Sequence, residues 1–200
     1  MGVLTFEQCI QAAAAKGEAI NSLFEERLFD LVGVLHKIAA VLAAENVSYE
    51  LIGGLAVLVH VEEADPEHTT LTRDVDLMIR REDLERIKEA ASRHDFRFRH
   101  AAGVDMLVYG ARYNLHLIFS DENVSPRIAP VRKTIHGGEV MVIPVPDLVW
   151  MKLSSFRDKD RVHVRSMDAA GLITPKSRPS YRRCCWRDYA TSGRRNECGS

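Results

Sequence analysis

The sequence predicts an α+β domain, resembling an α/β protein in places, in which helices flank a mixed β-sheet. Segments with helical apolar spacing alternate with short runs of aliphatic and β-branched residues along most of the chain, as expected when helices are layered on a sheet. Hydrophobic residues make up 46% of the 200 residues and charged residues 28%, which is ordinary globular usage and excludes wholesale disorder. No apolar run approaches the ~18–20 residues of a membrane span.

The N-terminal region, residues 1–45, is predicted to be helical. Residues 6–16 and 20–45 are interpreted as two helices, and Asn46 ends the second. Apolar side chains recur three to five residues apart along the second helix, which indicates one buried face: Leu23, Leu28, Leu31, Leu35, Ile38 and Leu42.

The core region, residues 46–145, begins with a strand, SYELIG (48–53), that runs into two glycines and the short helix LAVLVHV. A second strand is predicted over residues 70–79. The remaining elements follow in order: a helix over 83–94 and strands over 96–100, 104–110, 114–120 and 139–145.

The C-terminal helical segment, residues 146–173, is predicted to contain helices over 146–157 and 158–170. Arg157 and Asp160 are spaced to pair across one helical turn.

The last region, residues 174–200, contains no Leu, Ile or Val. Basic residues outnumber acidic ones in it: Lys176, Arg178, Arg182, Arg183, Arg187, Arg194 and Arg195 against Asp188 and Glu197. Three interpretations remain open: a disordered end, a change of reading frame near Thr174, and an RNA-binding tail that combines arginines with aromatic side chains.

The whole chain has a formal net charge of −1, which excludes a uniformly basic nucleic-acid coat. Its four cysteines show no zinc-ligand spacing and no secretory signal precedes them, so a reducing, cytoplasmic location without a membrane partner is expected.

Chemistry is predicted at the first strand–helix turn of the core. Gly53 and Gly54 let the backbone approach a ligand closely and leave N–H groups at a helix start, which suits phosphate. Asp74 and Asp76, two residues apart on the next strand, project to one face about 6.6–6.8 Å apart. Two such carboxylates repel each other unless a cation lies between them, and Mg²⁺ or Mn²⁺ prefers oxygen ligands.

These residues carry a resemblance. Gly53-Gly54, the helix after them, and Thr72-Arg73-Asp74-Val75-Asp76-Leu77 resemble the signature of the DNA polymerase beta-like nucleotidyltransferase superfamily. More closely, the chain is similar to small bacterial nucleotidyltransferase-like proteins that include abortive-infection-type toxins. The later segments NLHLIFSDENV and DLVWMKLSSFRDKDRVH share this similarity, which covers roughly residues 20–173.

The resemblance implies a minimal nucleotidyltransferase fold and transfer of a nucleotidyl group from an NTP to an acceptor hydroxyl, with release of pyrophosphate. It implies two divalent ions on Asp74 and Asp76, a triphosphate on Gly53 and Gly54, and a phosphate contact from Lys152. Thr72 shares the face of the aspartates and is expected to support the site, whereas Arg73 is expected on the opposite face.

Active members of the superfamily usually add a third carboxylate from a neighbouring strand. The matching position here is His116, and imidazole is a poor Mg²⁺ ligand. Asp105 on the preceding strand is the predicted substitute, with Glu122 as a second choice.

Alternatives therefore remain. The aspartates could mark an exposed strand end, the glycines a simple turn and Lys152 a solvated helix residue. The protein could also be a catalytically degenerate nucleotide-binding protein or one component of a toxin–antitoxin pair, with a partner protein. The acceptor could be a small molecule, a protein side chain or an RNA end.

Overall fold

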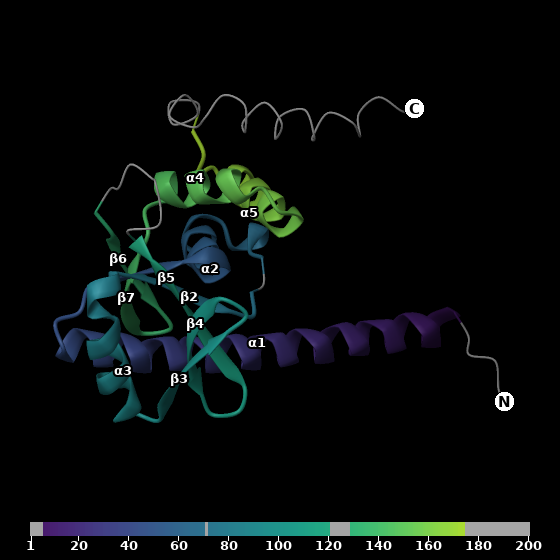
Figure 1. Ribbon diagram of the computed structural model, residues 1–200. Helices are drawn as coiled ribbons and strands as arrows, with labels where there is room; N and C mark the ends of the chain where they lie inside the picture. The colour runs from purple at the N-terminus through teal and green to yellow at the C-terminus, as the bar shows by residue number, and fades with distance from the viewer. Residues whose placement is uncertain (1–5, 71, 121–128, 175–200) are drawn as a thin grey trace.

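The structure is a computed structural model that describes residues 6–70, 72–120 and 129–174 (Figure 1). The tail from residue 175 and the alternative carboxylate Glu122 lie outside the described residues. Within these residues no helix combines the length and the hydropathy that a membrane crossing requires.

The centre of the molecule is a mixed sheet, which confirms the predicted fold class. Seven strands of the described chain form it in the order β3-β4-β5-β2-β1-β7-β6. The pairs β2–β5 and β1–β7 are parallel, and the other neighbours are antiparallel. The strands are β1 (Tyr49–Ile52), β2 (Val75–Ile79), β3 (Phe96–Ala101), β4 (Val104–Tyr109), β5 (Tyr113–Phe119), β6 (Val131–Ile135) and β7 (Gly138–Val142).

Helices cover the sheet on two sides. The long helix α1 runs across one side, and α2, α4 and α5 lie together on the other (Figure 1). The helices are α1 (Phe6–Ala44), α2 (Gly53–Ala64), α3 (Leu84–Ser92), α4 (Val145–Ser155) and α5 (Asp158–Ala169), with short 3₁₀ turns at Pro66–His68 and Arg81–Asp83.

Helix α2 is apolar on nearly every side, and it is enclosed in the hydrophobic core. Leu55, Leu58 and Val61 are fully buried, because α2 packs against β2 on one side and against α4 and α5 on the other. A helix that is hydrophobic all round is expected to be enclosed in this way. This enclosure fixes the start of α2, where the two glycines lie.

Three elements of the structure differ from the prediction. Residues 6–44 form one helix and not two, since the glycine between them, Gly17, costs only about 1 kcal/mol inside a helix. The second core strand is shorter than predicted and starts at Val75. Strand β6 was not predicted, because the charged Arg132 and Lys133 interrupt its apolar pattern.

Candidate active site

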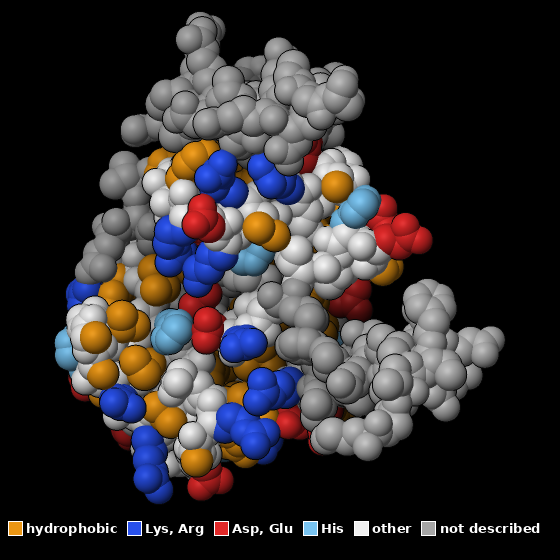
Figure 2. All heavy atoms as spheres, turned by 90° about the vertical axis from the view of Figure 1, so that its right-hand side faces the viewer, with side chains coloured by type: hydrophobic (Ala, Val, Ile, Leu, Met, Phe, Trp, Pro, Cys, Tyr) orange, Lys and Arg blue, Asp and Glu red, His pale blue; other side chains and the backbone are white. Residues whose placement is uncertain are grey.

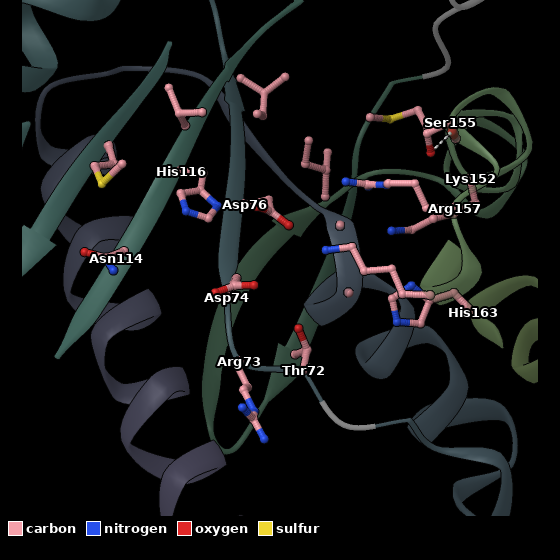
Figure 3. Close-up of a pocket in the computed structure, with 18 of the residues that line it drawn as sticks. Thr72, Arg73, Asp74, Asp76, Asn114, His116, Lys152, Ser155, Arg157 and His163 are labelled. Carbon is pink, nitrogen blue, oxygen red and sulfur yellow. Dashed lines mark hydrogen bonds and ion pairs between the residues drawn. The ribbon is translucent and has the colours of Figure 1, made fainter. Parts of the chain in front are cut away.

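A cavity of about 1080 Å³ opens beside the start of α2, between the sheet and the α4–α5 pair (Figure 3). Residues predicted from the sequence to form the site line this cavity together: Gly53, Gly54, Thr72, Asp74, Asp76 and Lys152. They come from three separate parts of the chain. The structure therefore gathers all the predicted site residues except Asp105.

The two glycines are required by the close approach of β2 and the residues before it. Gly53 has a φ of +73°, and a Cβ added there would lie 1.9 Å from Oδ2 of Asp76. A Cβ on Gly54 would lie 2.6 Å from Oγ1 of Thr72. Glycine thus lets Asp76 and Thr72 rest directly against the first turn of α2.

The first turn of α2 has no side-chain cap. Its N-cap residue is Ile52, whose side chain cannot accept a hydrogen bond from the helix. The first N–H groups of a helix have no partner within the helix, and they carry partial positive charge. This turn can therefore donate to an anionic oxygen in the cavity.

The aspartates reach the cavity from the start of β2. Asp76 lies within the strand and is half-buried, and Asp74 lies just before the strand and is exposed. Figure 3 shows both carboxylates on the cavity side, with Thr72 and Arg73 below them. Arg73, which was predicted on the opposite face, precedes the regular strand and is among the residues that line the cavity. Figure 3 shows its guanidinium directed away from the two carboxylates.

His116 stands next to Asp76 on the sheet. The parallel register of β2 and β5 places the two residues directly opposite each other. Nδ1 of His116 donates a hydrogen bond of 2.9 Å to Oδ1 of Asp76. This hydrogen bond raises the pKa of His116 above its ordinary value, against the opposing effect of burial. The position that matches the third carboxylate therefore does lie at the aspartates, and it holds an imidazole.

Asp105 does not join the site. The register of β4 and β5 pairs Asp105 with Leu117, which is one residue away from His116 and so points to the other face of the sheet. There Asp105 accepts a hydrogen bond of 2.5 Å from Nδ1 of His100. The prediction of Asp105 as the third carboxylate at this site is corrected by this register.

The opposite wall of the cavity carries a buried ionic cluster. Nζ of Lys152 on α4 lies 3.1 Å from Oδ1 of Asp160 on α5, and both side chains are buried. Nε of Arg157 and Oγ of Ser155 each donate to Oδ2 of Asp160 at 2.8 Å. The predicted pairing of Arg157 with Asp160 is confirmed.

The cluster fixes the charge states of its members. Burial alone would raise the pKa of Asp160, but the hydrogen bonds from Arg157 and Ser155 and the charge of Lys152 hold it well below its usual range. Burial lowers the pKa of Lys152, and the Asp160 carboxylate opposes that shift. One anion therefore faces two cations, which leaves net positive charge on this wall.

His163 on α5 also lines the cavity and was not identified from the sequence. It is 8% exposed, and its Nδ1 has no hydrogen-bond partner among the described residues. Burial and the charge of Lys152 lower its pKa to about 4, so the ring is neutral at pH 7. Nothing in the local pattern RVHVRS separates this buried histidine from a surface one.

The donor set fits one divalent ion that shares its ligands with a substrate. Among the described residues that line the cavity, the acidic ones are Asp74 and Asp76. No group of three or more potential ligands is arranged around a metal position in the described chain. Mg²⁺ is commonly bound by one or two carboxylates together with substrate phosphates and water. The described lining of the cavity holds no third carboxylate for the second ion that the resemblance implied.

The mixed sheet, the glycine turn and the aspartates on the neighbouring strand define a class of protein, the nucleotidyltransferases with a DNA polymerase beta-like fold. The chain belongs to the family of nucleotidyltransferases of unknown function DUF6036, whose family profile matches residues 26–174. No curated protein sequence matches the chain.

Solved structures share the fold at low sequence identity. The solution structure of the antibiotic-resistance factor ANT(2'')-Ia has a TM-score of 0.56 and 16% identity, covering 84% of this chain and 97% of that chain. An antigenic nucleotidyltransferase-like protein from Paracoccidioides brasiliensis has a TM-score of 0.52 and 19% identity, covering 72% and 77%. The Megavirus polyadenylate synthase has a TM-score of 0.59 and 10% identity, covering 84% and 38%.

Proposed function

We propose that this protein transfers a nucleoside monophosphate from an NTP to an acceptor hydroxyl and releases pyrophosphate, with Mg²⁺ or Mn²⁺ held by Asp74 and Asp76. The observation that carries the proposal is the joint lining of one cavity by these two carboxylates, the uncapped first turn of α2 and the cationic α4–α5 wall. Membership of a nucleotidyltransferase family supports the same reaction class.

In this reaction the residues of the chain mainly position and neutralise phosphate. The first-turn N–H groups at Gly53 and Gly54 donate to phosphate oxygens, and the Thr72 hydroxyl lies beside them. Lys152 and Arg157 are held by Asp160, so their positive charge is fixed in place before substrate arrives. Fixed charges and orientation of this kind account for much of the catalysis in such sites.

A divalent ion bound at the aspartates would neutralise charge on the phosphates and make the acceptor hydroxyl more acidic. The acceptor oxygen then bonds to the α-phosphorus, and the bond from that phosphorus to the bridging oxygen breaks. Pyrophosphate leaves with the electron pair, and the hydroxyl proton passes to solvent. Asp76 is kept in position by Gly53 on one side and His116 on the other.

The test is pyrophosphate release from each NTP with Mg²⁺ in the presence of cell extract as the source of acceptor. Asp74→Asn and Asp76→Asn are expected to lose at least about 100-fold in rate, because each removes a charge on which the ion depends. Asp105→Asn is the matched control, since Asp105 lies on the other face of the sheet. Wild-type rates in the first two variants would refute the proposal.

A second candidate is a protein that binds a nucleotide without turnover, for example one component of a toxin–antitoxin pair with a partner protein. The imidazole of His116 at the third carboxylate position favours it. Calorimetry that shows Mg²⁺-dependent NTP binding, together with no pyrophosphate release in any extract, would select this candidate. The cytoplasmic location stays a prediction, which cell fractionation can test.

A further inference from the structure

The face of the sheet that carries Asp76 continues beyond the site towards the β3 edge. The register places Asp76, His116, Met106 and Arg99 directly opposite one another on β2, β5, β4 and β3. Directly opposed residues point to the same face. Neighbouring strands lie about 4.8 Å apart, so this row spans about 14 Å from Asp76 to Arg99. Both Met106 and Arg99 line the cavity, which therefore extends along the row.

The middle of this face is apolar and accessible. Met106, Val108 and Ile118 are half-buried, although β4 and β5 lie within the sheet and each has a strand on both sides. Val104, two residues before Met106 and so on the same face, is 36% exposed. This apolar strip can contact the flat faces of bases and the carbon atoms of sugars.

The outer rim of the face is basic. Arg97 and Arg99 on β3 point to the same side and are about 6.6–6.8 Å apart along the strand, and both are exposed. Figure 2 shows Lys and Arg side chains around the hollow on this side of the molecule. Once a divalent ion neutralises Asp74 and Asp76, the described lining of the cavity has no acidic residue left to attract a cation.

We propose that the β3–β4–β5 face is an acceptor site for the end of a single-stranded nucleic acid. The terminal hydroxyl lies at Asp74 and Asp76, sugars and bases contact the apolar strip, and phosphates bind Arg97 and Arg99. Arginine binds phosphate oxygens through paired, charge-assisted hydrogen bonds. This inference rests on the proposed function, because it names the acceptor for the same cavity.

Two other acceptors fit the face less well. A polycationic acceptor such as an aminoglycoside would meet Arg97 and Arg99 with like charge and find no described carboxylate beside the aspartate pair. An acidic peptide would match the arginines, but its ionised side chains would gain little from the apolar strip between them and Asp76. A nucleic-acid end satisfies both the charge and the apolar surface, and it carries the hydroxyl that the reaction needs.

The test is a binding titration of the full-length protein with a short fluorescent oligoribonucleotide that has a free 3′-hydroxyl, without NTP. The double variant Arg97→Ala/Arg99→Ala is expected to bind about tenfold more weakly at low salt. The slope of log binding constant against log salt should fall by about 0.7 for each arginine removed. Arg132→Ala is the control, since this exposed arginine lies on β6 at the other edge of the sheet.

Equal binding by the wild type and the double variant would overturn the inference, and so would no binding by the wild type. Tighter binding of tobramycin would assign the face to a polycation, and tighter binding of polyglutamate would assign it to an acidic protein; either result overturns it. Because the titration contains no NTP, its failure is distinct from failure of the pyrophosphate assay. The proposed function can therefore stand if this acceptor is wrong.

Discussion

At the scale of single residues, Gly53 links the backbone to the position of Asp76. Gly53→Ala places a methyl group against the Asp76 carboxylate and forces a left-handed alanine, which costs about 1–2 kcal/mol. We expect that loss of stability in urea denaturation, together with about a 100-fold loss of pyrophosphate release, because Asp76 must move.

Gly137→Ala is the control that separates the cost of a left-handed alanine from the contact with Asp76. Gly137 has a φ of +80°, and an added Cβ would meet nothing within 4 Å. This variant should pay a similar backbone cost and keep its activity. If both variants lost activity to the same extent, backbone strain alone would explain the Gly53 result, and the contact with Asp76 would have no functional role.

His163 gives a prediction for pH. Its pKa is lowered to about 4 in the folded protein, against about 6.5 in the unfolded chain. As pH falls from about 6.5 to about 4, the unfolded chain binds a proton that the buried ring does not, so stability falls. His163→Gln should remove on the order of 2 kcal/mol of this loss, seen as a flatter pH dependence of the urea midpoint.

The control for this prediction is Val162→Ala on the same helix, because Val162 is exposed and carries no titratable group. It should leave the pH dependence of the urea midpoint unchanged. A His163→Gln profile parallel to that of the wild type would show that the ring takes up a proton in the folded protein as readily as in the unfolded one.

The sequence predicted the glycines and the aspartates correctly as neighbours, because each pair is local and both lie in one strand–helix–strand unit, at the start of α2 and at the start of β2. It placed Asp105 wrongly, because the face of a strand residue depends on its register with β5, and a shift of one residue reverses that face. It missed His163, since the burial of this ring depends on how α5 packs beside α2.

At the scale of elements, α2 is the helix that must stay in place for the site to exist. Leu58 is fully buried between the sheet and the α4–α5 pair. Leu58→Ala should cost about 2–5 kcal/mol in urea denaturation, because it leaves a cavity in a packed layer. Val162→Ala on α5 is the control, since Val162 is 49% exposed and should change stability by less than about 0.5 kcal/mol. Similar losses in both would contradict the enclosed position of α2.

The accuracy of the predicted elements follows the strength of their local signals. Strands β3, β4 and β5 and helices α3, α4 and α5 begin and end within a few residues of prediction, because each has a clear apolar period and a turn beside it. Strand β6 has charged residues at two of its five positions. Only its antiparallel pairing with β7 makes it a strand, and that pairing depends on the fold as a whole.

At the scale of the whole molecule, the cavity depends on two walls that are distant in the sequence. The sheet supplies Asp76 and His116, the segment before β2 supplies Asp74, and α4 and α5 supply the ionic cluster. Asp160 accepts from Lys152 on α4 and from Arg157 at the start of α5, so it joins the two helices. A ligand that contacts both walls should therefore stabilise the folded protein as a unit.

Binding of an NTP analogue to both walls should raise the free energy of unfolding by mass action. With Mg²⁺ and a non-hydrolysable analogue at about 100 times its Kd, the expected gain is about 2.7 kcal/mol, measured as a shift of the urea midpoint. Chelation of Mg²⁺ should remove most of the gain, and so should Asp74→Asn/Asp76→Asn, whereas Asp105→Asn should keep it. The same gain in the chelated sample would show that the nucleotide binds through the helix wall alone, and that the carboxylates hold no ion. Because the measurement does not require turnover, it tests the metal assignment equally for an active transferase and for a protein that only binds nucleotide.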